Sequence, residues 1–174
     1  KMDKSTPKIS VITVCYNAGD TMGRALESLR NQSSNNFESI VIDGLSSDNT
    51  AEVIKSYSDV VSHFISEKDS GIYDAMNKGL AIAKGDYIAF LDDDDLWLPG
   101  KLASQVAMLE RHPNAGMVYT WVDYIDRDGN FLYPSNRISA NEDLYTVLLS
   151  SNILVTGSNP MVKKCAFDTV GMFD

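Results

Sequence analysis

Short apolar runs alternate with segments of helical periodicity along the first two thirds of the chain. The apolar runs, rich in β-branched residues, cover residues 8–17, 37–44, 60–69 and 86–91. The segments that follow them, residues 19–32, 46–59, 71–85 and 99–112, carry apolar residues at helical spacing. Runs that are apolar on both faces are typical of strands buried on both sides. The alternation therefore predicts an α/β fold, with a mostly parallel sheet that is covered by helices on both faces.

The segment GIYDAMNKGLAIAKG shows how these helices are expected to pack. Its residues Ile72, Met76, Leu80 and Ala83 fall on one helical face, which we expect to cover the sheet. Gly85 follows and is expected to close the helix as a C-terminal cap. The chain then enters the apolar run DYIAFL, which is the predicted fourth strand.

The second part of the chain, from about residue 113, is more mixed. Asp128 and Gly129 form a tight-turn signal between two apolar runs and predict a hairpin. Residues 141–151 have the pattern of a short helix, and residues 157–164 are a possible last strand. No internal repeat or linker interrupts the sequence. We therefore expect one domain over residues 1–174, with some antiparallel strands in its second half.

The net charge of the chain limits the classes of partner that it can bind. The chain has 24 acidic and 15 basic residues, a net charge of −9. A nucleic-acid partner is excluded, because neutralising phosphates requires a basic surface. An acidic protein that binds a phosphate ligand needs a cation between the two. No apolar run is long enough to be a transmembrane segment and the first residues lack a signal-peptide core, so we expect a cytoplasmic protein.

Four consecutive aspartates, Asp92 to Asp95, follow the predicted fourth strand directly. Ligands of open α/β sheets bind beyond the carboxyl ends of the strands. In an extended chain alternate side chains share a side, so we expect Asp92 and Asp94 to face together. Such a D-x-D pair is a compact oxygen ligand set for a divalent cation. The alternative, a solvated acidic loop, fits less well because Trp97 follows at once.

Other polar residues stand at the ends of the first two strands. Tyr16 is a candidate for stacking on a nucleobase, with Asn17 shaping the turn; an ordinary turn with a half-buried tyrosine fits equally well. Asp43 can accept a hydrogen bond from a base or ribose, although Asp-Gly is also a plain turn former. Asp69 and Asn77 are further candidates for ligand contact.

Two further polar residues of the predicted third helix are expected to have structural roles and not to contact a ligand. Asp74 and Lys78 are more simply part of a solvated helical face. The sequence has no dinucleotide fingerprint, P-loop or serine-hydrolase elbow.

Four motifs occur together in a known order: ISVITVCYN, VIDGLSSDNT, GIYDAMNKG and GDYIAFLDDDDLWLPGKL. As a set they resemble family 2 glycosyltransferases of the GT-A fold, and GIYDAMNKG resembles bacterial members that build surface polysaccharides. The resemblance implies a three-layer α/β/α sandwich. It also implies transfer of a sugar from a nucleotide-diphosphate donor to an acceptor hydroxyl, dependent on Mg²⁺ or Mn²⁺ and with inversion of the anomeric centre.

The resemblance also assigns roles to individual residues. The implied nucleotide-sugar-binding positions are Val14, Tyr16, Asn17, Asp43, Asp69, Asn77, Asp92 and Asp93. Asp94 matches the metal ligand, with Asp92 as its partner, and Asp95 matches a second acidic position of less defined role. Uridine is the most frequent base in the family. The implied acceptor is a saccharide or a lipid-linked saccharide.

The general base of the family normally lies in an acidic motif beyond a G-x-F-D-E stretch, and this chain ends at GMFD. We therefore expect the base after Asp174, a donor-binding part over about residues 8–112 and an incomplete acceptor part over about residues 113–174. We also expect an intact enzyme that can lie at the inner face of the membrane. The alternatives are a nucleotide-sugar-binding fragment without transfer activity and, less favoured, a nucleotidyltransferase.

Overall fold

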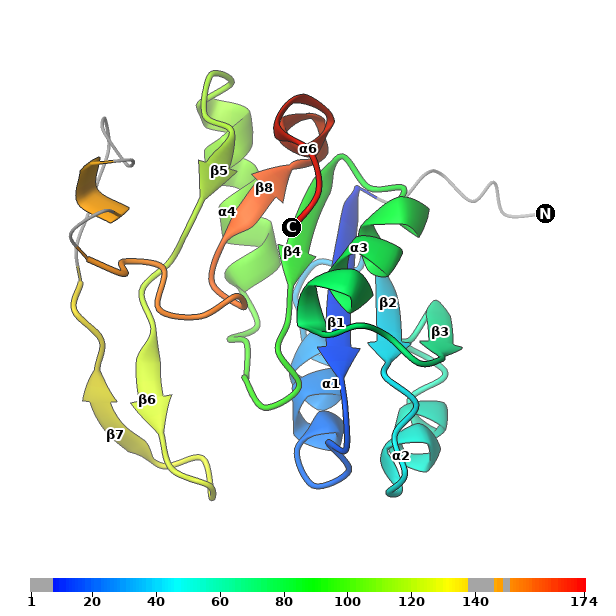
Figure 1. Cartoon of the computed structure of the whole chain (residues 1–174). Helices are drawn as coiled ribbons and strands as arrows, with labels where there is room; N and C mark the ends of the chain where they lie inside the picture. Colours follow the sequence, from blue (N-terminus) through cyan, green and yellow to red (C-terminus); the bar gives the residue numbers. More distant parts are fainter. Residues whose placement is uncertain (1–7, 138–145, 149–150) are drawn as a thin grey trace.

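A six-stranded mixed sheet forms the centre of the molecule in the computed structural model, which describes residues 8–137, 146–148 and 151–174 (Figure 1). Its strands are β1 (Ile9–Cys15), β2 (Phe37–Asp43), β3 (His63–Ser66), β4 (Tyr87–Phe90), β5 (Met117–Val118) and β8 (Met161–Lys163). They lie in the order β3-β2-β1-β4-β8-β5. The first four strands are parallel, and β8 is antiparallel to both of its neighbours. The predicted mostly parallel sheet with an antiparallel element from the second half is confirmed.

Helices cover both faces of this sheet. They are α1 (Met22–Arg30), α2 (Thr50–Ser56), α3 (Ile72–Ile82), α4 (Lys101–Arg111) and α6 (Lys164–Val170). On one face Leu29 of α1 and Leu102 of α4 pack with Val11 of β1, and α2 adds to the same layer. On the other face Leu80 of α3 packs with Ile12 of β1 (Figure 1). The expected three-layer sandwich is therefore present.

A separate hairpin projects beside the sheet in the second part of the chain. It consists of β6 (Asp123–Ile125) and β7 (Phe131–Pro134), as the sequence predicts. Gly129 takes the left-handed backbone conformation of the turn, with φ at 88°. Of the short helix predicted over residues 141–151, residues 146–148 are helical, whereas 141–145 and 149–150 lie outside the described residues.

Two details of the predicted third helix are wrong. Ile72 is 57% exposed, because the buried face of α3 is formed by Ala75, Gly79 and Leu80 instead. Gly85 does not cap the helix, which ends at Ile82 and continues into extended backbone at Ala83. A Cβ at Gly85 would lie 2.5 Å from the Ser10 backbone nitrogen, so glycine is required for a close approach to β1.

The strand order places a crevice beside β1. The chain builds β2 and β3 on one side of β1, crosses through α3, and continues on the other side with β4 (Figure 1). Loops after β1 and β4 therefore diverge at this switch point, where open α/β sheets bind their ligands. Within the described part of the chain, no helix has the length and apolarity needed to cross a membrane.

Candidate active site

A cleft of about 440 Å³ opens at the carboxyl ends of β1 and β4, and we call it the acidic cleft. It is lined by Val14, Cys15, Tyr16, Asp69, Gly71, Ile72, Ala75, Asp92, Asp93 and Asp94. Six of the predicted site residues meet here: Val14, Tyr16, Asp69 and the first three aspartates of the run. Three others, Asn17, Asp43 and Asn77, are not among its lining residues.

The aspartate run turns instead of continuing as an extended strand. The Asp95 backbone N–H lies 3.3 Å from the Asp92 carbonyl oxygen, which closes a turn over the run. The expected extended geometry is therefore wrong, although Asp92 and Asp94 do line the same cleft, together with Asp93. The Thr156 hydroxyl oxygen lies 2.7 Å from a carboxylate oxygen of Asp92 and 2.7 Å from one of Asp95. Asp94 is exposed and has no hydrogen-bond or ion-pair partner in the described ranges.

The cleft concentrates negative charge. Burial, together with the carboxylates on either side, raises the pKa of Asp93 to about 6. Burial also raises the pKa of Asp92, although the Thr156 hydroxyl acts in the opposite direction. No lysine or arginine is found among the residues that line the cleft. A ligand that carries phosphates can be held here only if a cation accompanies it.

The donor atoms of the run fit a divalent cation. Carboxylate oxygens are the ligands that Mg²⁺ prefers, and it usually keeps several waters and binds substrate phosphates as well. Among the described residues, no three His, Cys, Asp or Glu side chains converge as a complete metal site. Within the described residues the aspartate run could supply only part of a coordination shell, and the carboxylate of Asp94 is exposed.

Tyr16 lines the cleft together with the aspartates. Its side chain is 65% exposed. The next residue, Asn17, is in the left-handed region with φ at 53°. Its backbone N–H donates to the Ser46 hydroxyl at 2.8 Å, and its side-chain oxygen accepts from the Ser47 N–H at 2.9 Å. Asn17 thus shapes the turn and fixes it to the loop after β2, which leaves the Tyr16 ring free for a ligand.

Asp43 is enclosed beneath the loop after β2. Its side chain is fully buried, and its carboxylate accepts from the Ser66 hydroxyl at 2.6 Å, from the Ser46 N–H at 3.2 Å and from the Ser46 hydroxyl. The neighbouring Cys15 thiol remains protonated, because burial and the Asp43 carboxylate raise its pKa. The structure thus gives Asp43 a role in ordering the loop that carries Ser46.

Asp69 reaches the cleft from the segment before α3. Its carboxylate accepts from the Gly71 backbone N–H at 2.9 Å. A Cβ on Gly44 would lie 2.7 Å from an Asp69 carboxylate oxygen and 3.4 Å from a ring carbon of Tyr16. The absence of a side chain at Gly44 therefore lets the loops after β1, β2 and β3 close around one space.

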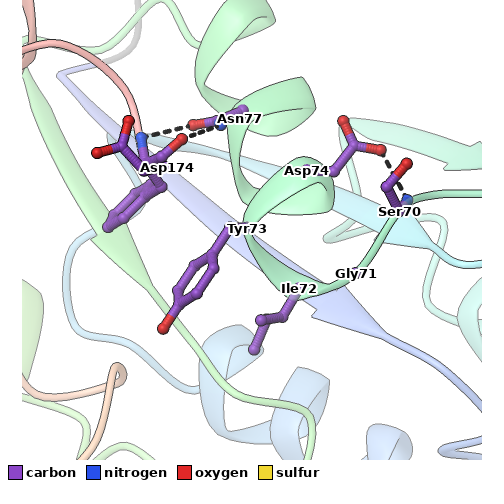
Figure 2. Close-up of a pocket in the computed structure, with 8 residues that line it drawn as sticks. Ser70, Gly71, Ile72, Tyr73, Asp74, Asn77 and Asp174 are labelled. Carbon is purple, nitrogen blue, oxygen red and sulfur yellow. Dashed lines mark hydrogen bonds between the residues drawn. The ribbon is translucent and has the colours of Figure 1, made fainter.

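A second cleft of about 420 Å³ adjoins the first and shares Gly71 and Ile72 with it. It is lined by Ser70, Gly71, Ile72, Tyr73, Asp74, Asn77, Phe173 and Asp174 (Figure 2). Asn77 donates from its amide to the Phe173 carbonyl at 2.8 Å and accepts from the Phe173 N–H at 3.0 Å. The Phe173 ring stacks on Tyr73 with centroids 6.0 Å apart. Asn77 therefore holds the last described segment against α3.

Asp74 and Lys78 have surface roles, in line with the structural interpretation of their sequence. The Asp74 carboxylate accepts from the Ser70 N–H at 3.0 Å (Figure 2). The Lys78 ammonium forms an ion pair with Glu67 at 2.9 Å.

The sequence interpretation missed the loop over residues 154–159. Its residues Thr156 and Ser158 contact Asp92 directly, the Ser158 hydroxyl accepting from the Asp92 N–H at 2.7 Å. The available signal was the cluster TGSN, small polar residues immediately before a strand. This cluster was assigned partly to the strand, which in fact begins at Met161.

Known proteins resemble this chain in sequence. A relative from Bacillus subtilis, named a putative teichuronic acid biosynthesis glycosyltransferase, TuaG, is 35% identical over 151 residues, which cover 82% of this chain and 59% of the relative. Among curated relatives that the chain matches, the matched part covers between 26% and 59% of the relative's own length.

Solved structures share the fold. Staphylococcus aureus TarS residues 1–349 in complex with UDP superposes with a TM-score of 0.72 at 21% identity, covering 96% of this chain and 50% of TarS. The mannosyltransferase PcManGT from Pyrobaculum calidifontis, in complex with GDP-Man and Mn²⁺, gives a TM-score of 0.72 at 22% identity, covering 98% of this chain and 48% of that one. The fold is that of the GT-A glycosyltransferases, as the sequence motifs predict. Residues 10–171 match the description Glycosyl transferase family 2, and the chain belongs to this family.

Proposed function

We propose that this chain binds the nucleotide-diphosphate sugar of a metal-dependent, inverting glycosyltransferase. The observation that carries the proposal is the acidic cleft itself. Three carboxylates at the end of β4 line the same cleft as the exposed ring of Tyr16 at the end of β1, and no basic side chain lines the space between them. Such a cleft can bind a nucleobase against the tyrosine ring and a metal-bound diphosphate beside the carboxylates.

The residues take different parts in holding the donor. Tyr16 stacks against the base, and Val14 lies beside it in the cleft wall. Asp92 and Asp93 lie near the ribose, and Asp94 offers the free carboxylate to the cation. Asn17 and Asp43 act on the donor indirectly, through the loops that they hold in place.

Mg²⁺ or Mn²⁺ bound at Asp94, with Asp92 nearby, would supply positive charge against the diphosphate as it departs. The Mn²⁺ in the PcManGT complex supports a divalent cation in this fold. The UDP of the TarS complex and the GDP-Man of the PcManGT complex support a nucleotide-sugar donor. We favour a UDP-sugar by the resemblance of the motifs.

We place the acceptor, a saccharide or lipid-linked saccharide, toward the second cleft. This cleft continues from the acidic one through Gly71 and Ile72 and offers the exposed ring of Tyr73 beside carboxylates. The teichuronic acid assignment of TuaG supports a role in cell-surface polysaccharide synthesis. Because the chain spans little more than half of such relatives, binding without transfer is the second candidate.

Calorimetric titration of UDP and GDP, with and without Mn²⁺, tests the proposal. We expect one nucleotide to bind only when Mn²⁺ is present. Asp94→Ala is expected to abolish this binding, because the cation loses the one exposed carboxylate of the run.

Asp128→Ala is the matched control, because it removes an exposed carboxylate at the tip of the β6–β7 hairpin. Equal affinity for Asp94→Ala and the wild type with Mn²⁺ present contradicts the metal assignment. Binding of neither nucleotide to the wild type contradicts the proposed donor class. A transfer assay on the same sample then separates an enzyme from a binding module.

A further inference from the structure

The loop over residues 154–159, which we call the bracing loop, contacts the aspartate run at three points. The Thr156 hydroxyl lies between the carboxylates of Asp92 and Asp95, 2.7 Å from each. The Ser158 hydroxyl accepts from the Asp92 N–H at 2.7 Å. A Cβ on Gly157 would lie 3.3 Å from an Asp92 carboxylate oxygen, so the loop backbone approaches the carboxylate closely.

The bracing loop is itself held firmly by buried contacts. The Trp97 indole N–H donates to the Ser158 carbonyl at 2.9 Å, and the Gln105 amide donates to the Asn159 carbonyl at 2.9 Å. The Asn159 side-chain oxygen accepts from the Thr120 N–H at 2.7 Å. Ser158 and Asn159 are 3% and 2% exposed. Thr156 is therefore presented from a fixed support and not from a mobile surface loop.

Backbone strain in the bracing loop also indicates that its conformation is fixed by the surrounding contacts. Val155 has φ at 68°, a conformation that β-branched residues rarely adopt. Such strain persists only where the surrounding contacts over-determine the backbone, and it clusters at functional sites. Here it lies directly before Thr156.

We propose that Thr156 is a positioning residue of the donor site. Its single hydroxyl proton, in a three-centre hydrogen bond to the Asp92 and Asp95 carboxylates, joins the run to the bracing loop and so fixes the turn from which Asp94 projects into the acidic cleft. The inference rests on the proposed function, because it assigns the hydroxyl a part in binding the cation and the diphosphate. Partners that orient metal-binding carboxylates set the affinity for the metal even though they do not touch it.

Thr156→Val and Thr156→Ser form the test, because valine keeps the shape without the hydroxyl and serine keeps the hydroxyl. We expect Thr156→Val to weaken Mn²⁺-dependent nucleotide binding by about 10- to 100-fold. We expect Thr156→Ser to bind within about threefold of the wild type. Thr169→Val on α6 is the matched control, since the Thr169 hydroxyl bonds only within its own helix.

Two further readouts keep the inference separate from the proposed function. Mn²⁺ binding without nucleotide, measured by paramagnetic broadening of amide signals near the run, is expected to weaken in Thr156→Val and to recover in Thr156→Ser. Thermal unfolding of both variants shows whether the fold is retained. Wild-type affinity in Thr156→Val, or a serine variant as weak as the valine variant, overturns the inference. A wild-type chain that binds Mn²⁺ but neither nucleotide contradicts the proposed function alone, and one that binds neither contradicts both.

Discussion

The four aspartates at 92–95 are chemically identical, and only their surroundings give them different properties. Asp92 and Asp95 share the Thr156 hydroxyl, whereas neither Asp93 nor Asp94 has a side-chain partner among the described residues. Asp93 is partly buried, which raises its pKa to about 6, and Asp94 is exposed. At the scale of single residues, the structure therefore separates two carboxylates that contact a fixed loop from the exposed carboxylate that we propose as the metal ligand.

Lys101 is a second residue whose properties come from its surroundings. Its ammonium lies 4.1 Å from the centroid of the Trp97 ring and donates to the Asn159 carbonyl at 3.1 Å. Burial nevertheless lowers the pKa of Lys101 to about 7. The unfolded chain keeps this proton up to an ordinary lysine pKa near 10.5. Between pH 7 and about 10.5 the unfolded state therefore binds more protons, and stability must rise with pH.

We predict that the free energy of unfolding rises by about 1–2 kcal/mol from pH 7 to pH 10, and that Lys101→Met removes this rise. Urea unfolding at a series of pH values measures it. Lys55→Met, at an exposed lysine of α2, is the control and should keep the wild-type slope. Parallel pH profiles for wild type and Lys101→Met would contradict a neutral lysine in the folded state.

At the scale of elements, α3 links the sheet to both clefts. Its middle is fixed on β1 by close packing at Gly79, where a Cβ would lie 2.5 Å from a methyl carbon of Ile12. Its first turn carries Ile72, which is exposed and lines both clefts instead of the core. The same helix therefore serves as part of a packed layer at one end and as a wall of the site at the other.

We predict that Gly79→Ala lowers the free energy of unfolding by about 1–3 kcal/mol, because the added methyl group overpacks the interface with β1. In an Ile12→Ala background the same change should cost less, since the clashing side chain is gone. Chemical denaturation of the wild type, the two single variants and the double variant gives the coupling free energy between positions 12 and 79. Gly116→Ala, where a Cβ meets nothing within 4 Å, is the control. Equal costs in both backgrounds would show that α3 moves to accept the methyl group.

At the scale of the whole molecule, the two parts expected from the sequence share one sheet. Strand β8, from the second part, pairs with β4 and lies between β4 and β5. Its residue Met161 is fully buried in the same cluster as β1 and α4. The loop before β8 contacts Asp92. The proposed donor site thus includes contacts from residues well beyond about residue 112, the expected end of the donor-binding part.

The net charge of −9 acts at the same scale. Raising the ionic strength from 0.01 to 0.1 M shortens the screening length from about 30 to about 10 Å. We predict that the metal-free protein unfolds about 2–4 °C higher at the higher salt, because the repulsion among its carboxylates is screened. Thermal unfolding in NaCl measures this. The unfolding midpoint of Asp93→Asn should rise less with salt than that of the wild type. A wild-type midpoint that falls with salt would mean that attraction within ion pairs such as Arg30–Asp59 outweighs the repulsion among the carboxylates.

The fold and the general place of the site could be predicted from the sequence because they depend on local patterns. Apolar runs of strand length alternate with helical spacing, and the residues that carry polar chemistry stand directly after the strands. Since parallel strands align their carboxyl ends, Tyr16 and the aspartate run had to meet at one edge. The motif set was specific enough to indicate the family, which the match over residues 10–171 confirms.

Other properties were decided only by the tertiary structure, because they depend on contacts between residues far apart in the chain. The Thr156 hydroxyl, which lies between Asp92 and Asp95, joins segments more than 60 residues apart. The hydrogen bonds between Ser66 and Asp43 and between Asn77 and Phe173 also join residues that are distant in the sequence. A sequence pattern shows which side chains can bind a ligand. Whether a side chain is free to do so depends on which distant groups already occupy its hydrogen bonds.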